Sequence, residues 1–133
     1  MAQPELLVPA GNWEKLQIAI AYGADAVYFG GHQFSLRRRA GNFSPDEIAA
    51  AISYCHKHDV KAYLTLNLLP YNHDFPALHE FLTKLKALPP DALIIGDPGV
   101  VALCRKILPE VPLHLSTQAN TLNLHAAQFW YDP

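Results

Sequence analysis

Cysteine, strong net charge and long apolar runs are all scarce in this sequence of 133 residues. Its two cysteines, Cys55 and Cys104, lie far apart in segments that look helical, without a CxxC pair or a metal-like spacing. We interpret both as small buried apolar residues, so we expect these residues to hold no metal or cofactor. A chain of this length can bury enough surface to fold without disulfides or a metal.

Apolar runs stay short throughout the chain. No stretch approaches the ~20 apolar residues of a membrane span, and the first residues lack the basic start and apolar run of a signal peptide. We therefore expect a reduced, cytoplasmic protein with no membrane partner. The formal net charge of -2 argues against a protein that coats nucleic acid by charge alone, although it permits a local basic patch.

The sequence does contain a regular alternation of short β-branched or leucine-rich runs with longer helical runs, which predicts about five βα units. Ser44, Pro45 and Glu47 form the clearest helix start, a capping box with proline at the first helical position. Asn12 and Asp97 are predicted caps of two other helices. The predicted strands cover 5–9, 25–29, 60–67, 92–95 and 113–116, and the last predicted helix contains Leu122, Ala126 and Phe129.

Five βα units fit two α/β architectures. One is a five-stranded doubly wound parallel sheet, and the other is the N-terminal part of a TIM-type (β/α)8 barrel, which normally needs about 250 residues. A doubly wound sheet should be apolar on both faces. Here Thr65 and Asn67 alternate with apolar residues, as do His114 and Ser116, so one face is polar. We therefore favour a single domain over residues 1–133, an incomplete barrel that self-associates through its open edge.

Ligands collect at the carboxyl ends of parallel strands in either architecture, and the loops there are polar. The strongest electrostatic feature is a run of three arginines between Phe34 and Phe43. Arginines can grip phosphates or carboxylates in bidentate fashion, and neighbouring aromatic rings can stack on an unstacked base. His114 should point into the interior with Ser116 and Gln118, with a hydrogen-bonded core histidine as the alternative. No complete catalytic constellation, P-loop or GxGxxG motif is visible.

Five motifs follow one another along the chain: ELLVPAG at 5–11, GADAVY at 23–28, FSLRRR at 34–39, DALIIGDPG at 91–99 and HLSTQAN at 114–120. Together they resemble the N-terminal part of the peptidase U32 family, the collagenase-like proteases, over essentially the whole chain. The arginine run, the Pro70-Tyr71-Asn72 turn and the Asp97-Pro98-Gly99 step are most similar to the branch that hydroxylates the wobble uridine of transfer RNA. Other branches hydroxylate ribosomal RNA or take part in oxygen-independent ubiquinone hydroxylation.

The resemblance implies a barrel fold, transfer RNA as a partner, 5-hydroxyuridine as the product, and prephenate as the source of the hydroxyl group. It also implies an iron-sulfur cluster held by several cysteines, which Cys55 and Cys104 do not match. We therefore expect this chain to be the N-terminal portion of a longer protein and to be inactive alone. The substrate-binding candidates, without assigned catalytic roles, are Arg37, Arg39, Asn67, Asp97, His114, Ser116, Gln118 and Asn120.

Two further functions stay open at this point. One is a collagenase-like peptidase, for which the sequence supplies neither a nucleophile in a known context nor a metal site. The other is a non-catalytic half-barrel that pairs with another chain, which the short length suggests.

Overall fold

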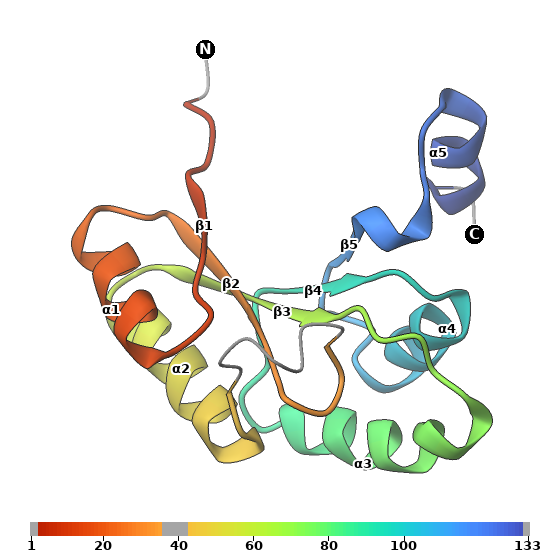
Figure 1. Ribbon diagram of the computed structural model, residues 1–133, viewed down its shortest axis with the longest axis horizontal. Coiled ribbons are helices and arrows are strands. Elements are labelled where there is room, and N and C mark those ends of the chain that lie inside the picture. The colour runs from red at the N-terminus through yellow and green to blue at the C-terminus, as the bar shows by residue number, and fades with distance from the viewer. Residues whose placement is uncertain (1–2, 36–42, 132–133) are drawn as a thin grey trace.

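The computed structural model describes residues 3–35 and 43–131 and shows an α/β fold (Figure 1). Five parallel strands form one sheet in the order β1-β2-β3-β4-β5, so neighbours in the sheet are also neighbours in the chain. The strands are β1 (Leu7–Pro9), β2 (Ala26–Gly30), β3 (Lys61–Leu66), β4 (Ala92–Ile95) and β5 (Leu113–Leu115). The helices are α1 (Trp13–Ala21), α2 (Pro45–Lys57), α3 (Phe75–Leu85), α4 (Pro98–Ile107) and α5 (Leu124–Tyr131), with short 3-10 turns η1 (Asn72–Asp74) and η2 (Thr117–Ala119).

Three helices begin at the caps that the sequence predicts. The Asn12 side chain accepts a hydrogen bond from a backbone N–H in the first turn of α1, and Asp97 does the same for α4. At the start of α2, the Ser44 hydroxyl accepts from the backbone of Glu47, whose carboxylate accepts from the backbone of Ser44. The predicted capping box is therefore confirmed. These caps satisfy backbone donors that the helices cannot pair internally.

The two faces of the sheet have different partners. On one face, strand residues such as Val27, Leu64 and Leu93 are fully buried in a large apolar core with the helices. The other face carries a small separate cluster made of Ala26, Tyr28, Tyr63, Ala92 and Ile94. Alternate residues of a strand point to opposite faces, so the alternation in the sequence separates a helix-covered face from an open one.

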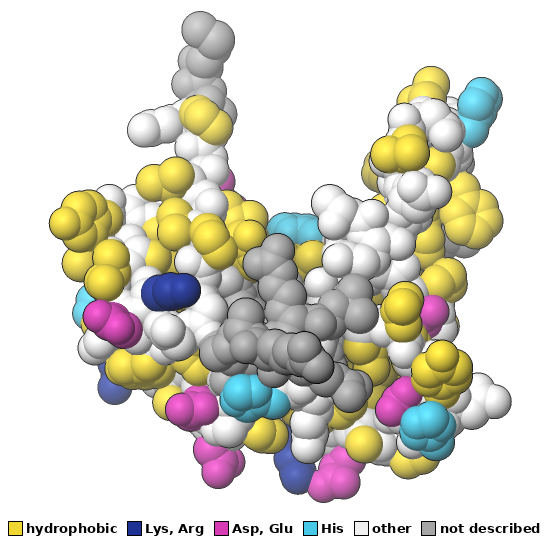
Figure 2. Space-filling model, in the orientation of Figure 1, with side chains coloured by type: hydrophobic (Ala, Val, Ile, Leu, Met, Phe, Trp, Pro, Cys, Tyr) yellow, Lys and Arg dark blue, Asp and Glu magenta, His cyan; other side chains and the backbone are white. Residues whose placement is uncertain are grey.

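The arrangement in space agrees with this division. In Figure 1, α1–α4 lie on one side of the strands, while the N-terminal segment and α5 project from the other side. Figure 2 shows a wide hollow between these two projections. None of the helices within residues 3–35 and 43–131 is both long and apolar enough to cross a bilayer.

Some local predictions differ from the structure. β1 begins at Leu7, because the backbone N–H of Leu6 donates to the Asp25 carboxylate at 2.7 Å. The last helix begins at Leu124, and Leu122 lies outside it. Asn123 explains this start, since its side chain accepts from the backbone N–H of a residue in the first turn at 2.9 Å.

The two phenylalanines that flank the arginine run are core residues. Phe34 is 6% exposed and Phe43 is 3% exposed. Their rings pack against those of Phe81 and Phe29, with centroids 5.1 and 5.2 Å apart. The prediction that these two rings stack on an unpaired base is therefore wrong, because burial in the core leaves them no free face.

Candidate functional site at the carboxyl edge of the sheet

A pocket of about 660 Å³ opens at the carboxyl ends of the strands. This is the edge where parallel α/β sheets bind their ligands, because the loops that follow successive strands converge there. The volume suits a small molecule or a single nucleotide. Its walls come from all five strands, from the segments after β1, β2, β3 and β5, and from the start of α1. The polar lining residues are Asn12, Lys15, Tyr28, Ser35, Thr65, Asn67, Ser116, Thr117 and Gln118.

Three buried hydroxyl groups meet in this pocket. Ser35, Thr65 and Ser116 are the polar residues buried within the described part of the chain, and all three line the pocket. Thr65 donates to the backbone carbonyl of Phe29 at 3.1 Å, and Ser116 donates to the side-chain oxygen of Gln118. Hydroxyl groups both donate and accept, so the pocket offers neutral hydrogen-bonding partners to a ligand.

Glycine allows the walls of the pocket to approach closely at two places. A Cβ atom on Gly30, the last residue of β2, would lie 2.5 Å from the Thr65 hydroxyl and 3.0 Å from Ser35. A Cβ atom on Gly96, after β4, would lie 3.0 Å from the Cβ of Gln118. The missing side chains therefore bring the loops after neighbouring strands into contact around the pocket.

The structure brings three of the predicted site residues together. Asn67, Ser116 and Gln118 all line the pocket. Asp97, His114 and Asn120 lie outside its lining, within the described part of the chain. Arg37 and Arg39 lie outside the described residues.

Asp97 and Asn120 have structural features of their own. The Asp97 side chain accepts from the backbone N–H of Val100 at 3.0 Å and so caps α4. Asn120 ends η2 with φ at 51°, in the left-handed region that asparagine tolerates better than most residues.

His114 lies on the open face of the sheet, as the strand alternation predicts. Its ring meets the Tyr63 ring edge-on, with centroids 5.0 Å apart. The Tyr63 hydroxyl donates to the Glu5 carboxylate at 2.6 Å, and Lys61 donates to the same carboxylate at 2.6 Å. The pKa of Glu5 is lowered mainly by the bond from Lys61 and then by the bond from Tyr63. A polar network thus links β5, β3 and the N-terminal segment.

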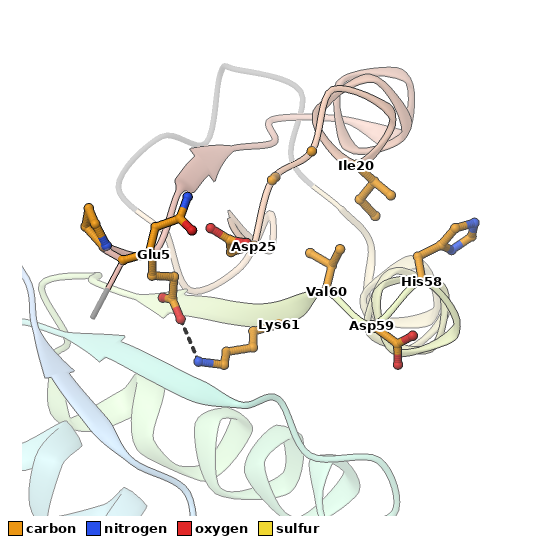
Figure 3. A pocket seen from close by; sticks show the side chains of 11 residues that line it. Glu5, Ile20, Asp25, His58, Asp59, Val60 and Lys61 are labelled. Carbon is orange, nitrogen blue, oxygen red and sulfur yellow. Dashed lines mark hydrogen bonds and ion pairs between the residues drawn. The ribbon is translucent and has the colours of Figure 1, made fainter. Parts of the chain in front are cut away.

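A second hollow, of about 730 Å³, lies at the amino ends of β1–β3 (Figure 3). Glu5 and Lys61 point toward one another there and form the ion pair, while His58 and Asp59 lie on the far side of the hollow. Because ligands of parallel sheets gather at the carboxyl edge and because Glu5 and Lys61 already satisfy each other, we take the carboxyl-edge pocket as the candidate site.

Sequence analysis missed several lining residues of the pocket. Ser35 and Thr65 were not singled out as binding candidates, although Thr65 shares a strand face with Asn67. Among the described residues of the lining, Lys15 is the cation, and it lies one helical turn beyond the cap of α1. Applying the two-residue period of β3 backwards from Asn67 would have found Thr65.

The two cysteines do not fit an iron-sulfur cluster. Both are fully buried in the apolar core, Cys55 on α2 and Cys104 on α4. Burial raises the pKa of the Cys55 thiol to about 11 and that of Cys104 to about 12, whereas cluster ligands are thiolates. Within the described residues, His, Cys, Asp and Glu form no group of three that could hold a metal ion.

A parallel sheet in sequential order, with a hydroxyl- and amide-lined pocket at its carboxyl edge, defines a βα-repeat fold with a candidate site for a small polar ligand. The chain belongs to peptidase family U32, whose model matches residues 11–133.

Three curated relatives are similar to nearly the whole chain. The "tRNA hydroxylation protein P" of Helicobacter pylori (strain ATCC 700392 / 26695) is 53% identical over 133 residues, which are 99% of this chain and 32% of that protein. The protein of the same name from Escherichia coli (strain K12) is 41% identical over 98% of this chain and 29% of its own length. The "Collagenase" of Porphyromonas gingivalis (strain ATCC BAA-308 / W83) is 34% identical over 95% of this chain and 30% of its own length. The chain thus spans about a third of the length of these relatives.

Proposed function

We propose that this chain acts in the hydroxylation of transfer RNA, as part of a U32 protein that forms 5-hydroxyuridine at the wobble position. The observation that carries the proposal is the 53% identity with a tRNA hydroxylation protein over the whole of the matched segment. Relatives named tRNA hydroxylation protein P1 and P, from other bacteria, share 43% and 39% identity over a similar length. We also expect a cytoplasmic location, since transfer RNA is the proposed substrate.

In this proposal the carboxyl-edge pocket holds the reacting group. Asn67 and Gln118 carry amides, which both donate and accept hydrogen bonds and so match the alternating edge of a uracil ring. Ser116 orients Gln118 through their hydrogen bond. Arg37 and Arg39 are proposed phosphate contacts, with Asp97, His114 and Asn120 as further candidates near the strand ends. A small dicarboxylate such as prephenate is the proposed hydroxyl source.

We further propose that the sheet is part of a (β/α)8 barrel that extends beyond these 133 residues, so that residues 1–133 form one incomplete domain. Sequential strand order supports this proposal, because a doubly wound sheet reverses its strand order at a switch point. The helix-covered face and the open, partly polar face support it as well. An iron-sulfur cluster in the complete protein would need cysteines other than Cys55 and Cys104.

The peptidase alternative has weaker support. One relative is named a collagenase, at 34% identity. In this pocket, however, Ser116 donates its hydroxyl hydrogen bond to Gln118, an amide that cannot act as a general base. We therefore prefer the RNA-modifying function.

The test is a complementation experiment in an Escherichia coli strain deleted for its own tRNA hydroxylation proteins. The complete reading frame that contains this chain should restore 5-hydroxyuridine, measured by mass spectrometry of digested transfer RNA. Gln118→Ala should lower the modified fraction at least tenfold, whereas Gln17→Ala, on the exposed face of α1, should not change it. Transfer RNA that stays unmodified with the wild-type gene expressed would refute the proposed function.

A further inference from the structure

Two aromatic side chains are displayed side by side in the loop that leaves β3. Tyr71 is 72% exposed, and the side chain of His73 is 79% exposed. Their ring planes are parallel within 2°, with centroids 5.8 Å apart. Exposed tyrosine is enriched at binding interfaces, and two parallel rings present flat faces rather than the edge of one ring.

One carboxylate holds both residues in place. Asp74 accepts a hydrogen bond from the backbone N–H of Tyr71 at 2.8 Å, and its second oxygen lies 3.6 Å from Nε2 of His73. The backbone N–H of Asp74 in turn donates to the carbonyl of Tyr71 at 2.9 Å. The turn is therefore closed on itself, so the rings lose little conformational freedom when a partner binds.

The turn lies at the same edge of the sheet as the pocket. Asn67 lines the pocket, and the next residue, Leu68, is buried and anchors the chain. Tyr71 comes four positions after Asn67, so their Cα atoms lie within about 14 Å of each other. After the turn, Phe75 packs against Gly99 in the first turn of α4, which also begins at the carboxyl edge.

We propose that Tyr71 and His73 form a stacking platform for an unpaired RNA base that neighbours the nucleotide held in the pocket. This inference rests on the proposed function. Aromatic faces bind single-stranded RNA by stacking, which needs no net positive charge on the protein. That fits a chain with a formal net charge of -2. The platform supplies exposed ring faces for stacking, which the buried rings of Phe34 and Phe43 do not.

The test measures binding of a fluorescein-labelled anticodon stem-loop RNA to the full chain by fluorescence anisotropy. Tyr71→Ala should weaken binding about tenfold, because one lost stacking partner has an effect of this order. Tyr71→Phe should bind as the wild type does, since the flat ring remains. The matched control is Tyr22→Ala, which removes another highly exposed tyrosine, 87% exposed, at the C-terminal end of α1, whereas the pocket is lined by the start of that helix.

Two further measurements separate stacking from other causes. The ratio between wild-type and Tyr71→Ala affinities should be the same at 50 and 200 mM salt, because stacking is not screened, whereas the Debye length that governs charge effects falls about twofold over this range. Asp74→Ala should weaken binding, whereas Asp74→Asn keeps an oxygen acceptor for the Tyr71 N–H and should bind more tightly than Asp74→Ala. Far-ultraviolet circular dichroism checks that each variant is folded.

The outcomes distinguish the two proposals. If the wild type binds RNA and Tyr71→Ala binds it equally well, the platform is refuted while the proposed function stands. If the wild-type chain binds no RNA under any of these conditions, the platform is refuted, and complementation decides the proposed function independently.

Discussion

Glu5 ties the N-terminal segment to the middle strand of the sheet. Its carboxylate accepts hydrogen bonds from Lys61 and from Tyr63, and both of those residues belong to β3. The same segment is held by Asp25, which accepts from the backbone of Leu6. A few polar contacts thus position a stretch of chain that packs little of its own surface.

The Glu5 network predicts a specific pH dependence of stability. Because its pKa is lower in the folded state, Glu5 stabilises the fold above the ordinary glutamate pKa of about 4.3. That stabilisation is lost as the pH falls through the lower folded-state pKa. Glu5→Gln should therefore flatten the decline of the melting temperature between pH 6 and pH 3. Glu110→Gln, in the exposed turn after α4, is the control and should leave the curve unchanged.

Two helix ends offer a second prediction at this scale. Just beyond the last residue of each helix the backbone turns left-handed, at Gly23 after α1, with φ at 88°, and at Asp59 after α2, with φ at 57°. In each case the next residue donates back into the last turn, from Ala24 to Ala19 and from Val60 to Cys55. Both helices are therefore followed by a residue in the left-handed conformation. Glycine is the residue type that this position favours, so Gly23 suits it and Asp59 does not.

Substitutions at Gly23 and at Asp59 should change the stability of the fold in opposite directions. Gly23→Ala should destabilise the fold by about 1 kcal/mol, because a Cβ atom is disfavoured in the left-handed region. Asp59→Gly should stabilise it by about 0.5 kcal/mol, since the relief of strain exceeds the entropy gained by the unfolded chain. Urea denaturation measures both changes. Equal effects of the same sign would contradict this account.

The sequence could not predict contacts between residues that lie far apart in the chain. The Glu5–Tyr63 hydrogen bond spans 58 positions, and nothing local to either residue indicates it. The burial of Phe34 depends on its meeting Phe81, from a helix far along the chain. Local chemistry cannot tell a core ring from a ligand-binding ring, because both are aromatic residues near a polar loop.

At the scale of elements, local signals placed the starts of three helices and the fourth strand, although the starts of β1 and α5 differ from the prediction. Asn12, Ser44 and Asp97 cap the helices that the sequence predicts, because a capping bond depends on residues only three positions apart. The fourth strand is found at the predicted residues, 92–95. The alternation along β3 also identified the open face, since neighbouring side chains of a strand always point to opposite sides.

The capping box of α2 gives the prediction at this scale. Ser44→Ala should lower the free energy of unfolding by about 1 kcal/mol, because it leaves a backbone donor of the first turn without its partner. Ser53→Ala, in the middle of the same helix, is the matched control. It should be neutral or slightly stabilising, since alanine has the higher helix propensity. Urea denaturation of the two variants checks the difference, and equal midpoints would contradict the role of the cap.

At the scale of the whole molecule, β1 and β5 are the two edge strands of the sheet. β1 pairs with β2 and β5 pairs with β4, so each has a second edge without a strand partner in the described part of the chain. Apolar side chains are exposed beside these edges: Leu7 and Leu115 are each 40% exposed. Figure 2 shows further apolar side chains gathered over α5, where Phe129 is 71% exposed.

Open edges and exposed apolar side chains together favour association with other chains. We therefore expect the 133-residue chain to show a concentration-dependent mass above 14.8 kDa in light scattering after size exclusion. Leu115→Lys should shift the population toward 14.8 kDa, because a charge beside the β5 edge opposes pairing with another strand.

Ile18→Lys tests whether self-association depends on the strand edge or on exposed apolar surface in general. Ile18 is 50% exposed, but it lies on a helix, α1, and not in either edge strand. This variant should therefore associate as the wild type does. A single species of 14.8 kDa at every concentration would show that the open edge does not drive self-association, and equal shifts in the two lysine variants would attribute it to apolar surface rather than to the strand edge.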